Sequence, residues 1–262
     1  MPHRTSFVHT KGGTGKTTAA VNIAGFLSRK NQNAVLVDGD PEGHATRNLG
    51  LEPERLDTGF HDLLEDGLSR PRDAVYPTAY GVDVVPGMQR LHDTYDAAGT
   101  DVDSMVGSAV EAVEDRYDHV IIDAPSSYRR VVAGALRASQ DYYLVLDSSI
   151  FAQQGSQALK SFLRRLPERH EIRINPTGAL FHRERGGGPL QRLKSAVLGA
   201  SENRAERIAR ALFRDRLVTV PYCDAVVESQ AEGRPLSHFD PVPAEARAYE
   251  EVAEDIIRYS WR

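Results

Sequence analysis

The sequence has almost no cysteine and no long apolar run. Cys223 is the only cysteine among 262 residues, which excludes an internal disulfide and any cysteine-rich metal or iron–sulfur site within one chain. No apolar run approaches the roughly 20 residues that cross a bilayer, and no signal peptide is visible. The scattered histidines lack the spacing of a zinc site. We therefore expect a protein of the reducing cytoplasm with no membrane segment.

Short apolar runs alternate with helical patterns along the whole chain. The runs predict strands buried on both faces of a parallel sheet: Thr5–His9, Ala34–Asp38, Val82–Val85, Val120–Asp123, Tyr143–Leu146, Gly178–Phe181 and Leu217–Val220. Helices are expected between and after them: Lys16–Lys30, Val102–Arg116, Arg130–Ser139, Gln154–Leu166, Asn203–Arg214 and Pro243–Tyr259. This alternation predicts one α/β domain over residues 1–262, with a mostly parallel central sheet and helices on both faces.

The segment KGGTGKTT, Lys11–Thr18, stands between a predicted strand and a predicted helix. Its glycines let the backbone curl with N–H groups facing inward, and the helix N-terminus adds positive charge, so the segment predicts the phosphate cradle of a P-loop NTPase. In such a loop Lys16 reaches the β- and γ-phosphates, and the Thr17 hydroxyl ligates Mg²⁺. The expected nucleotide-binding residues are Gly12, Gly13, Thr14, Gly15, Lys16, Thr17 and Thr18.

Two further motifs place carboxylates where predicted strands end. VDGDPEGHAT, Val37–Thr46, carries Asp38 and Asp40, which point the same way on an extended chain. One of the pair can help to hold the water shell of a metal ion while the other orients an attacking water. YDHVIIDAP ends a strand in Asp123, as a Walker B motif does, and a carboxylate there meets Mg²⁺ through water. Parallel sheets bind their ligands at these strand ends. We therefore expect Thr17, Asp38 and Asp123 to form the magnesium site.

The phosphate loop departs from the ordinary Walker A pattern at its start. Thr10 stands where that pattern has glycine, and Lys11 follows it, which gives the deviant form KGGxGK[ST]. This form resembles the ParA, MinD and nitrogenase-iron-protein group of ATPases, and DGDPEGHAT resembles the DxDPQGNAT run of ParA partitioning ATPases. The resemblance implies a slow, Mg-dependent ATPase. It also implies that Lys11 contacts the phosphates of the opposite subunit, that Lys16 acts within its own, and that Asp40 positions the water.

The resemblance to ParA covers nearly the whole chain, although Glu42 and His44 replace the usual Gln and Asn. Val220–Leu236 resembles the segment that follows the family's last strand, and the absence of an N-terminal helix-turn-helix implies the short type of ParA. MinD-like proteins end in a basic membrane helix, whereas Pro243–Tyr259 has an acidic polar face that anionic lipid repels. Nitrogenase-iron-protein relatives need bridging cysteines, and Cys223 does not stand in a matching context.

A partition cycle is what this resemblance implies. ATP joins two subunits in a nucleotide-sandwich homodimer, and the dimer binds nonspecific double-stranded DNA over the nucleoid. Hydrolysis, stimulated by a ParB-like partner, then releases the dimer. Such a cycle segregates or positions a plasmid, a chromosome region or another large cargo. The sequence leaves both the cargo and the partner open.

Positive charge is concentrated in one stretch of an acidic chain. The net charge is −5, yet Arg183–Arg216 contains nine basic and four acidic residues, a surplus of +5 that leaves about −10 elsewhere. Four arginines fall within roughly 120° of one helix surface: Arg204, Arg207, Arg210 and Arg214. They predict contact with DNA phosphates, and a solvated arginine-rich helix is the alternative. Family members often carry basic residues just after the final strand, whereas Pro221–Asp224 has none.

Three rival functions stay open at this point. A metabolic ATP-dependent ligase of the dethiobiotin or cobyrinate type needs a carboxylate-substrate pocket, for which no motif is present. A MinD-like membrane switch is disfavoured by the acidic C-terminal helix. A scaffold that uses ATP only to dimerise would not need the four arginines. The loop Arg183–Pro189 has no assigned partner.

Overall fold

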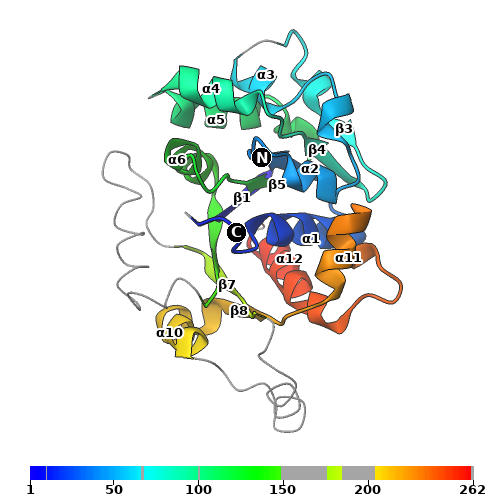
Figure 1. Cartoon of the computed structure of the whole chain (residues 1–262), viewed down its shortest axis with the longest axis vertical. Helices are drawn as coiled ribbons and strands as arrows, with labels where there is room; N and C mark the ends of the chain where they lie inside the picture. The colour runs from blue at the N-terminus through cyan, green and yellow to red at the C-terminus, as the bar shows by residue number, and fades with distance from the viewer. Residues whose placement is uncertain (10, 66–67, 100, 149–175, 185–203, 261–262) are drawn as a thin grey trace.

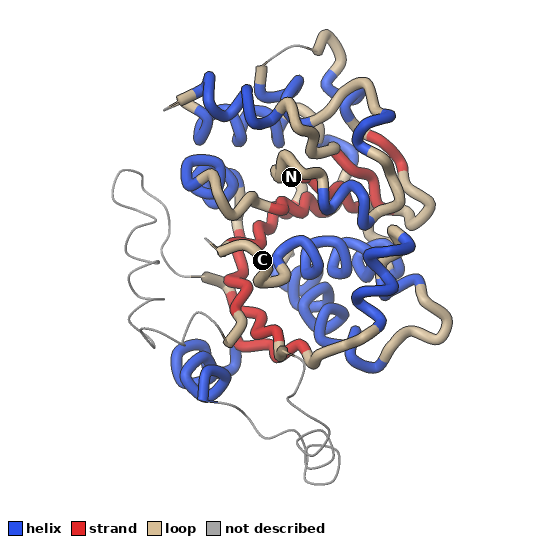
Figure 2. The backbone as a smooth tube through the Cα atoms, in the orientation of Figure 1, coloured by secondary structure: helices blue, strands red, loops and turns tan. Residues whose placement is uncertain are grey.

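The computed structural model describes residues 1–262 apart from 10, 66–67, 100, 149–175, 185–203 and 261–262. The expected helix Gln154–Leu166 and most of the Arg183–Pro189 loop lie outside the described residues. Helices cover both faces of a single sheet (Figures 1 and 2). The predicted α/β fold with a mostly parallel sheet is confirmed.

The described residues form an eight-stranded sheet in the order β3-β4-β2-β5-β1-β6-β7-β8. Its strands are β1 His3–Val8, β2 Ala34–Asp38, β3 Tyr76–Pro77, β4 Val82–Val85, β5 His119–Asp123, β6 Asp141–Leu146, β7 Gly178–His182 and β8 Leu217–Val220. Neighbouring strands are parallel except for β3 and β4, which are antiparallel. Each expected strand is present with its ends shifted by at most two residues, and only the short β3 was not expected.

Side chains along the central strands alternate between two apolar layers. In β2, Val35 and Val37 belong to one layer, and Ala34 and Leu36 belong to the other. Both layers are shielded from solvent, because these four side chains are at most 2% exposed. A strand buried on both faces needs apolar residues at every position, which is why these strands stand out in the sequence as continuous apolar runs.

One face of the sheet is covered by α1 (Lys16–Arg29), α2 (His44–Asn48) and α12 (Arg247–Tyr259), with α11 (Ala225–Glu232) at its rim. Ala20, Ile23, Ala24 and Leu27 line the inner face of α1 and are fully buried. The last helix likewise packs its apolar stripe, Tyr249, Val252, Ala253 and Ile256, into the core. That helix begins at Arg247 rather than Pro243, because Ala244–Ala246 form a 3-10 turn first.

The opposite face carries α3 (Phe60–Leu64), α4 (Leu91–Ala98), α5 (Val102–Glu111), α6 (Arg129–Ala138) and α10 (Arg204–Phe213). Neither α3 nor α4 was expected. The prediction of one helix over Val102–Arg116 was wrong at its end, since α5 stops at Glu111 and a 3-10 turn follows. The last arginine of the expected helix Asn203–Arg214 also lies beyond α10, because its φ of 51° is left-handed.

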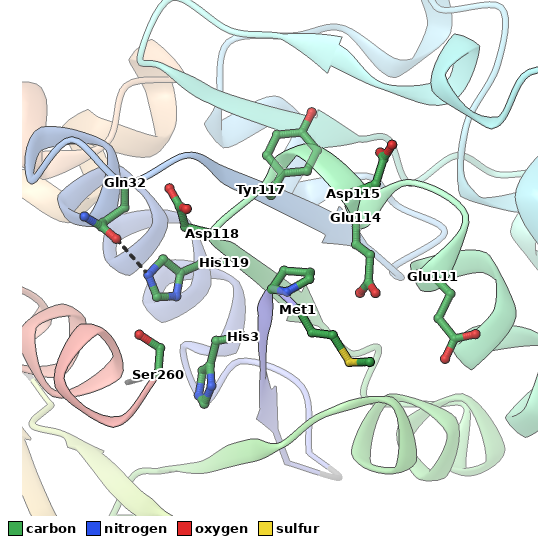
Figure 3. Close-up of a pocket in the computed structure, with 11 residues that line it drawn as sticks. Met1, His3, Gln32, Glu111, Glu114, Asp115, Tyr117, Asp118, His119 and Ser260 are labelled. Carbon is green, nitrogen blue, oxygen red and sulfur yellow. Dashed lines mark hydrogen bonds between the residues drawn. The ribbon is translucent and has the colours of Figure 1, made fainter. Parts of the chain in front are cut away.

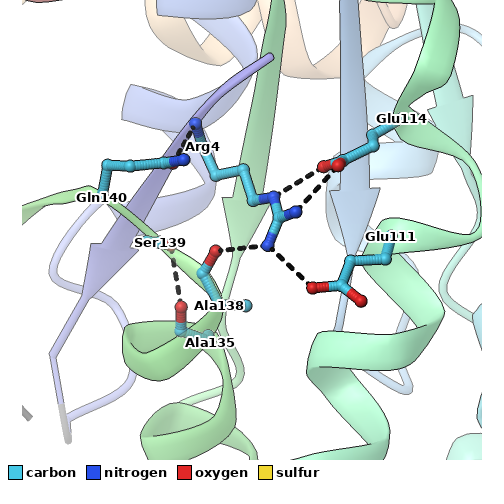
Figure 4. Close-up of polar contacts among 7 residues, drawn as sticks. All are labelled: Arg4, Glu111, Glu114, Ala135, Ala138, Ser139 and Gln140. Carbon is cyan, nitrogen blue, oxygen red and sulfur yellow. Dashed lines mark hydrogen bonds and ion pairs between the residues drawn. The ribbon is translucent and has the colours of Figure 1, made fainter. Parts of the chain in front are cut away.

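A cluster of ion pairs lies at the amino ends of the central strands. Arg4 of β1 places its guanidinium nitrogens 2.6 and 2.8 Å from the carboxylate oxygens of Glu114, and it also contacts Glu111 and the carbonyl of Ala138 (Figure 4). A cavity of about 530 Å³ lies beside this cluster, with His3 and His119 among its lining residues (Figure 3). This edge of the sheet is opposite the phosphate loop, so the cavity is not the nucleotide site.

Candidate functional site

Three of the sequence motifs meet at the carboxyl ends of three adjacent strands. The phosphate loop follows β1, Asp38 ends β2 and Asp123 ends β5, and these strands stand in the order β2-β5-β1. Asp38 and Asp123 are register partners, and Phe7 of β1 is the partner of Asp123 on the other side. The sheet therefore brings the two aspartates and the loop together, as the sequence predicted.

The phosphate loop has the backbone of an anion cradle. Gly13 and Gly15 have φ values of 77° and 91°, a left-handed conformation that glycine adopts without steric cost. Gly12 and Gly13 are exposed, so their backbone is accessible to a ligand. Helix α1 begins at Lys16 without a side-chain cap and without an acidic residue in its first turn. Its N-terminal N–H groups can therefore bind an anion.

The two lysines of the loop lie in different environments. Lys16 is 7% exposed, and its Nζ lies 3.4 Å from the backbone carbonyl oxygen of Lys11. Burial lowers the pKa of Lys16, while the charges of Asp123 and Asp40 act to raise it. The side chain of Lys11 is exposed, and its backbone N–H donates to His9 Nδ1 at 2.8 Å. Lys16 is thus held inside the cradle, and Lys11 stands at its outer surface.

Asp123 is a buried carboxylate without a hydrogen-bond partner among the described residues. It is 1% exposed, and neither of its oxygens is satisfied. Burial, followed by the charge of Asp38, raises the pKa of Asp123 to about 8. Thr17 lies close enough to act against this rise in pKa, although it lacks the geometry of a hydrogen bond. A divalent cation between Asp123 and Thr17 would supply the positive partner that this buried carboxylate lacks.

Asp38, in contrast, is fully engaged by its own loop. Its Oδ2 accepts from the N–H and the hydroxyl of Thr46 at 2.8 and 2.7 Å, and its Oδ1 accepts from the N–H of Asp40 at 3.1 Å. Burial raises the pKa of Asp38 to about 6, and the bonds from Thr46 oppose that rise. The structure thus shows Asp38 as the anchor of the 40–46 loop. Its predicted role at the metal stays a prediction.

Asp40 stands at the open side of the site. Its side chain is 26% exposed, and its carboxylate accepts from the N–H of Glu42 at 3.0 Å. The segment before it is fixed by Tyr95 of α4, whose hydroxyl donates to the carbonyl of Gly39 at 2.8 Å. The N–H of Gly39 in turn donates to the carbonyl of Asp123 at 3.0 Å. Asp40 is therefore accessible to water and held on a fixed backbone.

Sequence reasoning missed the residues that support the site from a distance. Thr46 anchors Asp38, Tyr95 anchors Gly39, and His182 contacts the carbonyl of Thr14 at 2.8 Å. Tyr95 and His182 lie far along the chain from the motifs that they contact. Thr46 stands inside a motif that the sequence singled out, and its position eight residues after Asp38 was the one signal available.

The observed geometry fits a magnesium nucleotide. The left-handed glycines and the uncapped start of α1 suit a polyphosphate, and the unsatisfied Asp123 beside Thr17 suits a hydrated divalent ion. Metal sites built from three or more His, Cys, Asp or Glu side chains are not found among the described residues. Mg²⁺ commonly takes one or two carboxylates and completes its shell with water and phosphate, as this site would allow.

Helix α10 carries three of the four predicted arginines, the fourth follows it, and a buried ion cluster lies beneath the helix. Arg204, Arg207, Arg210 and Arg214 are all exposed. Glu206, on the inner side of the helix, is 1% exposed and accepts two hydrogen bonds from Arg183, at 2.9 and 2.8 Å. Arg210 lies 3.4 Å from the same carboxylate. The sequence predicted Arg210 as a DNA contact, and the structure places it in this cluster as well.

Comparison with known proteins identifies the family. Residues 3–175, well over half of the chain, match the family described as an AAA domain. The chain belongs to this family. It is 28% identical to the chromosome-partitioning ATPase Soj of Thermus thermophilus, over 97% of this chain and 95% of Soj. It is 26% identical to the chromosome partitioning protein ParA of Caulobacter vibrioides, over 96% of this chain and 92% of ParA.

These relatives extend over nearly the full length and place the chain in the ParA/MinD superfamily. It is a P-loop ATPase. The identification agrees with the resemblance that the motifs carry. The deviant Walker A form and the assignment to the short type of ParA rest on the sequence alone and stay predictions.

Solved structures share the fold. A cobyrinic acid a,c-diamide synthase from Mycobacterium smegmatis with bound ADP and magnesium has a TM-score of 0.72 at 23% identity, covering 99% of this chain and 95% of that one. MinD from Pyrococcus horikoshii, complexed with Mg-ADP, has a TM-score of 0.74 at 22% identity, covering 98% and 96%. At these identities the likeness shows the fold alone. A metabolic enzyme and a positioning ATPase share it, so the fold does not choose between them.

Proposed function

We propose that this protein is a partition ATPase that works as an ATP-dependent homodimer. In its ATP state the dimer binds nonspecific double-stranded DNA over the nucleoid, in the cytoplasm. Hydrolysis, stimulated by a ParB-like partner, ends this state and allows a plasmid, a chromosome region or another large cargo to be segregated or positioned. The curated relatives Soj and ParA carry chromosome partitioning in their names, which supports this proposal.

The observation that carries the proposal is the contrast between the two lysines of the phosphate loop. Lys16 is enclosed, so it serves the nucleotide of its own subunit. Lys11 is exposed beside the exposed Gly12 and Gly13, so a second copy can approach this side of the loop. A cation contributed from the opposite subunit stabilises the charge that develops in phosphoryl transfer, as an arginine finger does.

The remaining site residues have defined tasks in this scheme. Thr17 and Asp123 hold the hydrated Mg²⁺, and Asp38 keeps the loop that carries Asp40 in place. Asp40 orients the attacking water from the open side of the site. The magnesium nucleotide supplies the electrophilic phosphorus. The side chains supply position and charge.

Helix α10 and Arg214, the residue that follows it, form the candidate DNA surface. Arg204, Arg207 and Arg214 are exposed, so their charges are accessible to phosphates. Arg210 also contacts Glu206, which makes it a poorer probe of DNA binding than its three neighbours. Dimerisation would present two copies of this surface and raise the affinity for DNA through avidity.

The first test is binding to nonspecific duplex DNA with ATP, with ADP and without nucleotide, across a salt series. ATP-dependent, salt-sensitive binding is expected. It should be lost in Lys11→Ala and prolonged in Asp40→Ala, which traps the ATP dimer. Negligible binding in all nucleotide states would overturn the DNA proposal.

Matched variants separate DNA binding from the rival functions. Combined alanines at Arg204, Arg207 and Arg214 should abolish DNA binding, whereas Arg55→Ala, 77% exposed on another surface, should not. A scaffold that only dimerises would show no difference between these variants. Phosphate release without any added metabolite counts against a ligase. No helix among the described residues is long and apolar enough to cross a membrane.

A further inference from the structure

An imidazole from β7 contacts the phosphate loop from the side. His182 is the last residue of β7, and its Nδ1 lies 2.8 Å from the carbonyl oxygen of Thr14. Its Nε2 lies 3.2 Å from the hydroxyl of Tyr249 on α12. The ring packs so closely that a Cβ added at Gly15 would come within 2.2 Å of Nδ1. The loop is therefore joined to the C-terminal helix through one side chain.

The partners of His182 define its tautomer. A carbonyl oxygen only accepts, so Nδ1 must carry the proton that it donates to Thr14. Nε2 then accepts from the hydroxyl of Tyr249, whose ring is 2% exposed. Burial lowers the pKa of His182, which keeps the imidazole neutral. Each ring nitrogen thus has one role, and the two roles cannot be exchanged while Thr14 remains the acceptor.

The contact controls a peptide group of the cradle. The carbonyl of Thr14 and the N–H of Gly15 belong to the same planar trans peptide, so they point in opposite directions. When His182 holds the carbonyl on one side, the Gly15 N–H is directed to the other. Gly15, with a φ of 91°, lacks the side chain that would resist rotation of this peptide. Without the imidazole, the peptide could turn and withdraw an N–H from the phosphate.

We infer that His182 is a positioning residue of the ATPase site, which fixes the Thr14–Gly15 peptide for phosphate binding, with Tyr249 supporting it from α12. This inference rests on nucleotide binding by the phosphate loop. It does not depend on DNA binding or on dimerisation. His182 stands outside every motif that the sequence singled out, so this support comes from a part of the chain remote from the loop.

The test compares three replacements of His182 in a nucleotide-binding assay without DNA. In His182→Asn the amide nitrogen occupies a place close to that of Nδ1 and can still donate to Thr14. In His182→Gln the amide lies one bond further out, near Tyr249, and His182→Ala has no donor. One neutral hydrogen bond corresponds to roughly a 10-fold change in affinity or less. We expect Kd for Mg-ADP to rise ~5- to 10-fold in the alanine and glutamine variants and at most ~2-fold in the asparagine variant.

Steady-state kinetics and a second position complete the test. KM for ATP should rise with Kd while kcat changes less, because the peptide binds phosphate in both substrate and product. Tyr249→Phe should raise Kd only ~2-fold, since it removes the support and leaves the donor in place. A purely structural role would lower the midpoint of thermal unfolding in all variants without separating asparagine from glutamine.

Two results would overturn the inference. One is a wild-type Kd in His182→Ala. The other is an equal loss in the asparagine, glutamine and alanine variants. Lys16→Ala, run in parallel, reports on the nucleotide site itself. If Lys16→Ala binds Mg-ADP as tightly as the wild type does, the assignment of the nucleotide site fails, and the assignment of His182 fails with it. A negative DNA experiment leaves this assay unaffected.

Discussion

Asp123 at the nucleotide site and Glu206 beneath α10 are equally hidden, because each is 1% exposed. Their surroundings differ. Asp123 has no hydrogen-bond partner among the described residues, and burial raises its pKa to about 8. Burial also acts to raise the pKa of Glu206, but the hydrogen bonds from Arg183 and Thr219 and the charges of Arg183 and Arg210 together outweigh it, and the net shift is downward. An unsatisfied buried carboxylate marks a place for a cation, whereas a satisfied one supports the fold.

The largest effect is expected at the unsatisfied carboxylate. Asp123→Asn should lower ATP hydrolysis about 10- to 100-fold, the usual range when an outer-shell metal partner is lost. The fold should be retained, because an amide of the same size replaces a buried carboxyl group that has no hydrogen-bond partner to lose. Mg-dependent phosphate release and apo thermal unfolding measure the two effects. Asp115→Asn, at a side chain 70% exposed, is the control. Full activity, or unfolding of the apo protein, would contradict the comparison.

The satisfied carboxylate should behave in the opposite way. Glu206→Ala should cost about 1–3 kcal/mol of stability, because Arg183 loses its buried acceptor. The Kd for Mg-ADP should stay near the wild-type value. Denaturant unfolding and nucleotide titration measure the pair of effects. Glu54→Ala removes a surface ion pair with Arg47 and should change neither. A loss of nucleotide affinity in Glu206→Ala would show that the two regions are not separate.

Acid should lower the stability that the Glu206 cluster provides, by a smaller amount than Glu206→Ala does. The pKa of Glu206 is lower in the folded state than its ordinary value of 4.5. Its stabilising contribution is therefore present above pH 4.5 and is lost as pH falls through the folded pKa. Unfolding midpoints between pH 7 and 3 should fall less steeply in Glu206→Gln, which does not titrate. Parallel profiles for the two proteins would assign the acid sensitivity to other groups.

The smallest effect on the fold is expected at the exposed arginines. Arg207→Ala should change stability by less than about 0.5 kcal/mol, as most surface substitutions do. If the residue contacts a phosphate, the slope of log K against log salt for DNA should fall by about 0.9 per contact removed. Arg210→Ala should alter both quantities, because Arg210 also contacts Glu206. An unchanged salt slope in Arg207→Ala would favour the solvated-helix alternative.

The central part of this fold was predictable from the sequence because its signals are local. Each buried strand is a continuous apolar run, and the phosphate loop needs its glycines and Lys16 at fixed spacing. The neighbourhood of Asp38 and Asp123 followed from the rule that parallel strands end at one edge. The short helices α2, α3 and α4 were missed, because five- to eight-residue elements carry too little periodicity to be distinguished from loops.

The missing parts of the site were contacts between remote segments. The engagement of both Asp38 oxygens depends on how the 40–46 loop folds back, which no spacing rule describes. The helical wheel placed Arg204, Arg207 and Arg210 outward correctly, but Arg214 lies beyond the helix. The wheel also gave no sign that Glu206 would be held inward by Arg183. His182 and Tyr249 lie too far from Thr14 along the chain for the sequence to connect them. The catalytic, metal and DNA roles of individual residues stay predictions for the experiments above.

The end of β7 connects both regions through consecutive residues. His182 turns to one face of the sheet and contacts the phosphate loop, while Arg183 turns to the other and contacts Glu206. Strand residues alternate by a period of two, so a one-residue insertion or deletion in β7 would send each side chain to the wrong face. A chimera that grafts this strand from a relative must therefore keep the exact length up to residue 183, or it will lose both contacts together.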